Sequence, residues 1–184
     1  MKLDKFQEKL LLARLRSNDP DAYTSVYNAY IDKIYSFIFF KVSTHEEAED
    51  ITSDVFLRAW QYITSSDRDV KNLNAFLYQI ARNAVIDYYR SKSRVEIVRD
   101  EDIMKNIEDQ QQQRLLKEID VHSDFEKVEK IIKTLKDEYK DVVLLRYVEE
   151  LSISEISNVL NKSKGSVRVL IHRAIKLIKD EVEK

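Results

Sequence analysis

LSISEISNVLNKSKGSVRVLIHRAIKLIK, residues 151–179, is the stretch that decides how this chain folds. Ser152 and Glu155 form a capping-box pattern, which starts one helix. Asn161 tolerates the left-handed conformation in which helices often end, and Ser163 can cap a second helix. The stretch therefore predicts two helices joined by a short turn, which is the pattern of a helix-turn-helix.

The second helix of this pair is amphipathic and basic. Its apolar face consists of Val167, Leu170, Ile171, Ala174, Ile175 and Ile178. Residues 162–179 contain six Lys or Arg and no acid, and a helix N-terminus adds unpaired N–H groups and partial positive charge. In this motif the start of the second helix reads base edges in the major groove. A solvated charged face is the alternative. The candidate DNA-binding residues are Lys162, Lys164, Gly165, Ser166, Arg168, Val169, His172 and Arg173.

Composition extends the helical interpretation to the whole chain. One Gly and one Pro among 184 residues are too few for the turns of a sheet protein, so we expect an all-α fold. The absence of cysteine excludes disulfides and thiolate metal sites. No convergent set of acid, base and nucleophile is present, so we expect no enzyme, metal, cofactor or small-molecule substrate. No apolar run has the length of a membrane span, and we expect a cytoplasmic, nucleoid-associated protein.

The chain divides into two small helical domains. Fifteen of its eighteen aromatic residues precede position 95, and residues 95–124 contain nine acids, four bases and a run of four glutamines. Such a segment is typical of a flexible linker. We therefore predict a domain at 1–94, an acidic linker at 95–124 and a helix-turn-helix domain at 125–184.

Local signals predict three helices in the first domain. Asp19 and Pro20 are a cap and a first helical residue, and Thr44 with Glu47 form a capping box for a helix to about Tyr62. A polar loop is expected at 64–72, followed by a helix at 73–90. In the second domain, helices are expected from about 128 and at 140–148, ahead of the helix-turn-helix.

Two helices of the first domain have distinctive side chains. Five acids lie between 46 and 54: Glu46, Glu47, Glu49, Asp50 and Asp54. They could dock on a basic protein surface or form a solvated face. The helix from residue 73 interleaves aromatic and basic residues, which can hold single-stranded DNA; the alternative is that Phe76, Tyr88 and Tyr89 are core residues. These are Phe76, Tyr78, Tyr88 and Tyr89 among Arg82, Asn83, Arg90, Lys92 and Arg94.

At this point the sequence resembles a known family. DPDAYTSVYNAYIDKIYSFI, AEDITSDVFLRAW and NAFLYQIARNAVIDYYRSKSR occur in this order within residues 19–94 and are similar to region 2 of the extracytoplasmic-function (ECF) sigma factors. The stretch that starts with VEKIIKTLKDEYK at Val128 and runs to Asp180 resembles region 4, and this resemblance covers about residues 125–180. The resemblance covers most of the chain, and no further family domain is expected before Met1 or after Lys184.

The resemblance implies a transcription initiation factor that binds core RNA polymerase, directs it to promoter DNA and assists opening. It implies polymerase docking by Glu49, Asp50, Asp54 and Arg58. It implies minus-ten element binding by Tyr78, Arg82, Asn83, Arg90, Lys92 and Arg94, and minus-thirty-five binding by the helix-turn-helix. The loop 64–72 would help choose the captured base, and the linker would thread through the polymerase. An anti-sigma factor is a further partner that the resemblance allows.

Some positions depart from the family pattern. Ser53 replaces a common Gln, Phe76 a common Trp and Ser157 a common Ala, while Val169–Leu170 replace a Ser-Arg pair. The first departure affects docking detail, and the last affects promoter preference. Two other interpretations stay open: a stand-alone helix-turn-helix regulator that works without polymerase, and a helical adaptor with no DNA role.

Overall fold

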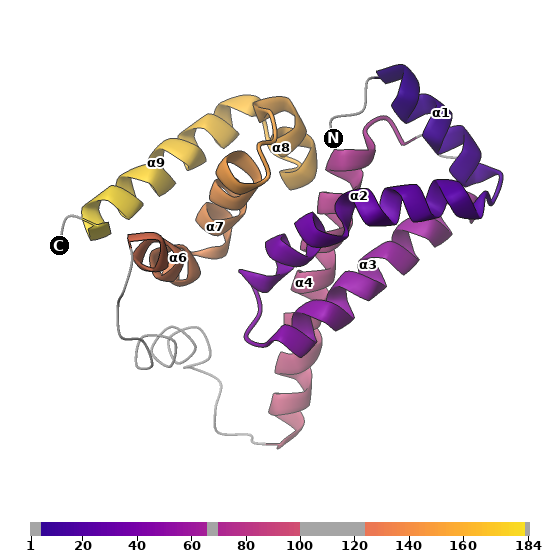
Figure 1. Ribbon diagram of the computed structural model, residues 1–184. Helices are drawn as coiled ribbons and strands as arrows, with labels where there is room; N and C mark the ends of the chain where they lie inside the picture. Colours follow the sequence, from indigo (N-terminus) through magenta and orange to yellow (C-terminus); the bar gives the residue numbers. More distant parts are fainter. Residues whose placement is uncertain (1–4, 66–69, 100–123, 183–184) are drawn as a thin grey trace.

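The computed structural model describes residues 5–65, 70–99 and 124–182, and these residues form helices without any strand. Figure 1 shows two groups of helices side by side: an N-terminal lobe of α1–α4 and a C-terminal lobe of α6–α9. The elements are α1 Lys5–Arg16, α2 Pro20–Phe39, α3 His45–Ser65, α4 Leu73–Arg99, α6 Asp124–Thr134, α7 Asp137–Val143, the π-helical turn η1 Leu144–Val148, α8 Ile153–Leu160 and α9 Lys164–Val182. Residues 100–123, most of the expected linker, lie outside the described residues, as do 66–69 of the expected loop.

The capping signals predicted from the sequence are confirmed. The Asp19 carboxylate accepts from the N–H groups of Asp21 and Ala22 at the start of α2. Thr44 Oγ1 accepts from the Glu47 N–H at 3.1 Å, and Glu47 Oε2 accepts from the Thr44 N–H at 3.2 Å. Each bond satisfies a backbone donor that a helix start or its cap leaves unpaired.

Three helix boundaries differ from the expectation. Helix α1 was not predicted from the sequence. The signal for it lies in its leucines, of which Leu12 and Leu15 are buried in the core. Helix α4 continues to Arg99 instead of ending near Arg90, since no Gly or Pro interrupts it there. The helix expected at 140–148 begins at Asp137 and changes to a π-helical turn after Val143.

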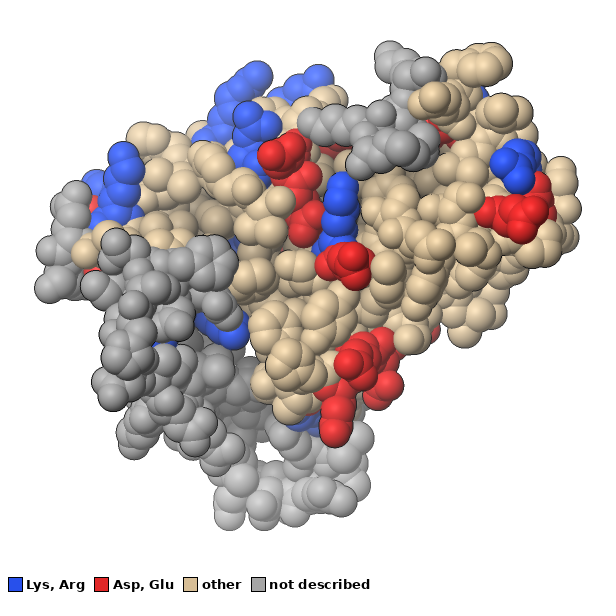
Figure 2. All heavy atoms as spheres, in the orientation of Figure 1, with Lys and Arg blue, Asp and Glu red and all other residues tan. Residues whose placement is uncertain are grey.

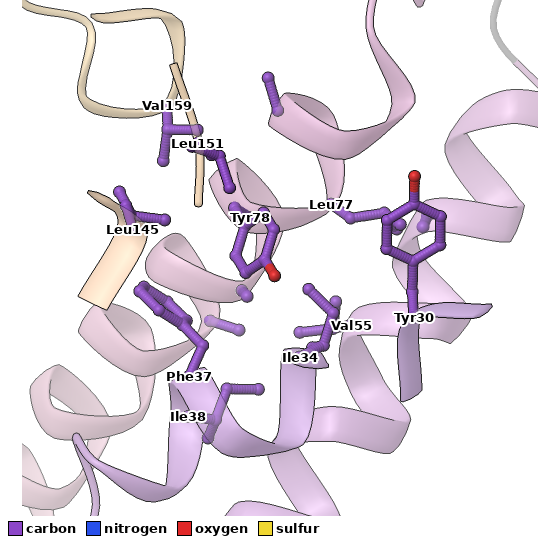
Figure 3. Packing of buried hydrophobic residues seen from close by; sticks show 14 of the residues in the cluster. Tyr30, Ile34, Phe37, Ile38, Val55, Leu77, Tyr78, Leu145, Leu151 and Val159 are labelled. Atoms are coloured by element: carbon purple, nitrogen blue, oxygen red, sulfur yellow. The ribbon is translucent and has the colours of Figure 1, made fainter. Parts of the chain in front are cut away.

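One continuous core joins the two lobes. Buried apolar residues of α2, α3 and α4 belong to the same cluster as buried residues of η1 and α8. Figure 3 shows the ring of Tyr78, on α4, between Phe37 of the N-terminal lobe and Leu151 of the C-terminal lobe. The rings of Phe37 and Tyr78 meet edge to face with centroids 5.5 Å apart. No spacing in the sequence predicts this contact between lobes.

Candidate nucleic-acid and protein interfaces

The turn before α9 has the geometry that a helix-turn-helix requires. Ser152 and Glu155 form the capping box of α8, and Asn161 ends it in the left-handed region at φ 51° and ψ 44°. Ser163 Oγ then accepts from the Ser166 N–H at 3.1 Å and caps α9. The hydroxyl of Ser157, where the family commonly has Ala, donates to the Lys162 carbonyl at 2.6 Å. Ser157 therefore links α8 to the turn and stabilises the turn's conformation.

Helix α9 buries one face and exposes its basic residues. Val167 and Ala174 are fully buried, and Leu170 is half-buried against the core. The remaining candidates on the helix are exposed: Lys164, Gly165, Ser166, Arg168, Val169, His172 and Arg173. Figure 2 shows several Lys and Arg side chains standing out from the upper left of the molecule, where α9 runs.

The structure shows what lies next to two of the candidate DNA-binding residues near the turn, Lys162 and Gly165. Lys162 Nζ lies 2.9 Å from Glu138 Oε1, so it already has an ion-pair partner in α7. A Cβ on Gly165 would meet only the Ser163 hydroxyl, at 3.7 Å. Because that distance is an ordinary contact, the fold itself does not require glycine at position 165.

The acidic residues of α3 separate into an exposed set and a structural one. Glu46, Glu49 and Asp50 are exposed. Glu47 turns toward α4 instead: its carboxylate accepts from the Tyr88 hydroxyl and from Lys92 Nζ at 3.0 Å. Burial by itself raises the pKa of Glu47, but the hydrogen bonds from Tyr88, Lys92 and the Ser43 N–H outweigh it and hold the pKa below its usual value.

Asp54 and Arg58 form an ordered pair one turn further along α3. Arg58 Nη2 lies 2.7 Å from Asp54 Oδ2, and its Nη1 lies 3.3 Å from Asp87 on α4. The hydrogen bond that Arg58 donates to Asp54 is the largest cause of the raised pKa of Arg58. Leu57, between them, is 53% exposed. The face thus combines fixed charges with an apolar side chain in solvent, which suits protein docking.

The candidate residues for single-strand binding are not all accessible. Asn83 and Arg90 are exposed, whereas Tyr78 is only 1% exposed, so its ring cannot stack on a base in this arrangement. Lys92 is paired with Glu47. The side chain of Arg94 lies outside the described residues. Burial of Tyr78 therefore departs from the role in base stacking expected for it, while Phe76, Tyr88 and Tyr89, for which the core alternative was weighed, are partly buried against the core.

A cluster of polar side chains lies where the lobes meet, and it joins two sequence-based candidates to three residues that the sequence did not single out. We call Lys41, Tyr78, Arg82, Asp141 and Glu149 the interlobe cluster. Asp141, at the end of α7, receives the Lys41 ammonium on one oxygen and Arg82 Nε on the other, the latter at 2.8 Å. The Tyr78 hydroxyl donates to the Glu149 carboxylate.

The interlobe cluster is largely removed from water. The side chains of Lys41 and Asp141 are 4% and 2% exposed, and that of Arg82 is 25% exposed. Burial raises the pKa of Glu149 despite the hydrogen bond from Tyr78, and burial together with the charge of Glu149 raises that of Tyr78. No sequence signal links these residues, since Lys41 and Asp141 are 100 positions apart.

Other kinds of site are not found in the part of the chain that the structure describes. Within 5–65, 70–99 and 124–182, no group of three or more His, Asp or Glu is arranged to hold a metal ion. None of the helices in these ranges combines the length and apolarity that crossing a membrane requires.

Comparisons with known proteins agree on one family. The sigma-70 region 2 model matches residues 26–95, and the sigma-70 region 4 model matches residues 125–178. The ECF RNA polymerase sigma factor SigW of Bacillus subtilis is 30% identical over 181 residues, covering 95% of this chain and 96% of SigW. BldN of Streptomyces coelicolor, also an ECF RNA polymerase sigma factor, is 29% identical over 91% of this chain, which spans 63% of BldN.

Solved structures show the same fold. CnrH, in complex with the cytosolic domain of CnrY, matches with a TM-score of 0.69 at 19% identity, covering 95% of this chain and 96% of CnrH. The sigma factor RpoE of Bartonella quintana, in complex with the anti-sigma factor NepR, matches with a TM-score of 0.68 at 17% identity, covering 88% of this chain and 96% of RpoE. With regions 2 and 4 both present and SigW matched along nearly its whole length, this chain belongs to the ECF group of the sigma-70 family of transcription initiation factors.

Proposed function

We propose that this chain binds core RNA polymerase through α3, reads the upstream promoter element with α9 and holds the opened minus-ten strand on α4. The observation that carries the proposal is α9: a capped helix after a left-handed turn, apolar on its inner face and basic on its outer face. Such a helix can enter the major groove and place Arg168 against base edges.

The N-terminal lobe supplies the other two contacts. Glu49, Asp50, Asp54 and Arg58 present charge along α3 for a polymerase surface. On α4, Arg82, Asn83 and Arg90 offer phosphate and base contacts once the strands separate, with Tyr78 available for stacking only after it leaves the core. We assign polymerase docking and minus-ten binding to residues 1–94, and binding of the upstream element to residues 125–184. The acidic segment 95–124 would run through a polymerase channel that is built for a polyanion.

Two further properties belong to this proposal. CnrH and RpoE are each held by a second protein, CnrY and NepR, and we extend to this chain the possibility of regulation by an anti-sigma factor. We place the protein in the bacterial cytoplasm, with the nucleoid, because the DNA that it would bind is promoter DNA. No catalytic residue is needed for these functions.

The test is run-off transcription with purified bacterial core polymerase on a library of promoter fragments, with and without this protein. We expect discrete transcripts only when the protein is added. Transcripts that do not depend on the protein, combined with tight binding to DNA alone, would favour a stand-alone regulator.

The docking face is tested by one charge reversal. Asp50→Arg changes an exposed residue and leaves the Asp54–Arg58 pair in place. We expect it to weaken binding to core polymerase by about tenfold, as loss of ~1.4 kcal/mol would. Asp32→Arg, an equally exposed aspartate on α2, is the matched control and should bind like the wild type. Equal affinities for the two variants would mean that the acidic face is merely solvated.

A further inference from the structure

The lysine in the turn before α9 has a carboxylate beside it. Lys162 Nζ lies 2.9 Å from Glu138 Oε1, and Glu138 belongs to the first turn of α7. The two side chains are 35% and 57% exposed, so the pair lies at the surface. An ion pair in such a position adds little to the stability of a fold. The pair can therefore open without disturbing the helices that carry it.

The turn fixes the backbone from which Lys162 projects. Asn161 stands before it in the left-handed region, and the Lys162 carbonyl accepts from the Ser157 hydroxyl at 2.6 Å. Helix α9 begins two residues later, at Lys164. In the proposed function the start of α9 enters the major groove, whose two edges are lines of phosphates. Lys162 is thus placed to meet the phosphates at one edge.

Resting on that proposed function, we propose that Glu138 is a built-in counterion of Lys162, which limits how strongly the helix-turn-helix holds the phosphate backbone. A phosphate oxygen bound to Lys162 Nζ would lie within about 6 Å of the Glu138 carboxylate, since each bond to the ammonium is close to 3 Å long. The phosphate must either displace Glu138 or bind beside a second anion. In both cases Glu138 cancels the charge that Lys162 would otherwise contribute.

This cancellation sets the salt dependence of DNA binding. Each lysine that neutralises a phosphate releases a counterion from the duplex and adds about 0.9 to the slope of log affinity against log salt concentration. A displaced Glu138 takes up a cation from solution, and a retained Glu138 leaves the pair without net charge. Lys162 therefore adds no counterion in the wild type. Lys164, Arg168 and Arg173 differ, because they are exposed and no ion pair is described for them among residues 124–182.

The pair acts on affinity and leaves sequence preference alone. Phosphate contacts carry no sequence information, whereas contacts to base edges do. Suppressing one phosphate contact therefore weakens binding to every duplex by the same factor. Glu138 thus lowers the affinity for DNA without a promoter, and the base contact proposed for Arg168 becomes a larger share of the total binding.

A neighbouring acid separates this role from the ordinary role of a helix-terminal carboxylate. Asp137 and Glu138 both lie in the first turn of α7, where negative charge stabilises a helix. Both are exposed, but among residues 124–182 no ion pair is described between Asp137 and Lys162. Asp137→Asn removes the same charge from the same turn and is the matched control for Glu138→Gln.

The experiment is fluorescence anisotropy of the full chain on the upstream sequence selected by the wild type and on its scrambled version. Relative to Asp137→Asn, Glu138→Gln should bind both duplexes more tightly by one common factor. Its salt slope should be steeper by about 0.9, so the gain should shrink about three- to fourfold between roughly 50 and 200 mM salt. In a Lys162→Gln background, Glu138→Gln should have no larger effect than Asp137→Asn.

The double-variant comparison decides between a local counterion and the general field of the protein. Equal gains and slopes for Glu138→Gln and Asp137→Asn would overturn the proposal, as would an effect of Glu138→Gln that Lys162→Gln leaves undiminished. Glu138→Ala, which puts a strong helix former in the same place, must steepen the slope in the same way, and an unchanged slope would count against the proposal. Run-off transcription tests the proposed function separately, because initiation does not depend on whether Glu138 limits phosphate binding.

Discussion

Arg168→Ala tests whether α9 reads sequence or only holds phosphate. A helix rises about 1.5 Å per residue, so Arg168 lies about 6 Å beyond the start of α9 at Lys164, and Lys176 lies about 18 Å beyond it. The major groove is about 12 Å wide. Arg168 can therefore reach the groove floor, whereas Lys176 is already at or past the phosphate edge.

The magnitude follows from this placement. A bidentate contact between arginine and guanine is worth about 1–3 kcal/mol of discrimination, so Arg168→Ala should lower affinity for the preferred upstream sequence by roughly tenfold to a hundredfold. Arg168 is exposed, and no ion pair is described for it among residues 124–182, so the fold should be unaffected. Lys176→Ala should weaken all sequences alike and reduce the salt slope by about one counterion.

The assay is fluorescence anisotropy of the full chain on two duplexes at several salt concentrations. The first duplex carries the upstream sequence selected by the wild type from a randomised library, and the second carries the same bases scrambled. Arg168→Lys, which keeps the charge without the bidentate geometry, separates the two roles. If Arg168→Ala lowers affinity for both duplexes by the same factor, Arg168 is a phosphate contact and the base-reading assignment is wrong.

Three further predictions concern the helix ends and the strand-binding helix. Asn161→Val should lower the free energy of unfolding by about 1–2 kcal/mol, because a β-branched residue is strained at positive φ; Asn161→Gly should not, and equal urea midpoints for both would contradict this. Glu47→Gln should cost about 1 kcal/mol at neutral pH, because Gln can keep the capping box but loses the charge-assisted hydrogen bonds from Tyr88 and Lys92. Since the folded pKa of Glu47 is lowered, its contribution is present above the ordinary glutamate pKa and is lost as the pH falls through the lowered value, so the variant and the wild type should converge in acid. Asn83→Ala should reduce promoter opening in permanganate footprints of the holoenzyme while closed-complex formation persists; Gln79→Ala, equally exposed on α4, is the control, and equal footprints would remove Asn83 from strand binding.

Local signals in the sequence predicted what depends on neighbours along the chain. The caps at Asp19, Thr44 and Ser152, and the left-handed residue Asn161, each involve residues no more than four positions apart. The apolar stripe of α9 could also be predicted from the sequence, because helical periodicity determines which side chains share a face. These features were enough to predict an all-helical fold and the helix-turn-helix.

Contacts between distant residues could not be predicted in this way. The pairing of Lys41 with Asp141, and of Tyr78 with Glu149, depends on how the two lobes pack. An aromatic residue among basic ones suits both a DNA-binding face and a core, and for Tyr78 the approach of the C-terminal lobe determines which is realised. Helix α4 ran past its expected end for a simpler reason, since a helix lacking a stop signal continues.

The π-helical turn η1 gives the C-terminal lobe its angular alignment. Successive residues of an α-helix are about 100° apart, so eight residues of regular helix would leave Glu149 about 80° around the axis from Asp141. In η1 the Glu149 N–H bonds to the Leu144 carbonyl, five residues back, at 2.9 Å, so each residue turns through a smaller angle. The wider turn absorbs the excess rotation and brings both carboxylates toward α4. Deleting one residue of Leu144–Val148 would restore a regular helix in which Glu149 follows Asp141 by seven residues, about 700° or roughly 20° short of two full turns. The π-helical turn thus holds one extra residue while both carboxylates keep nearly the same phase.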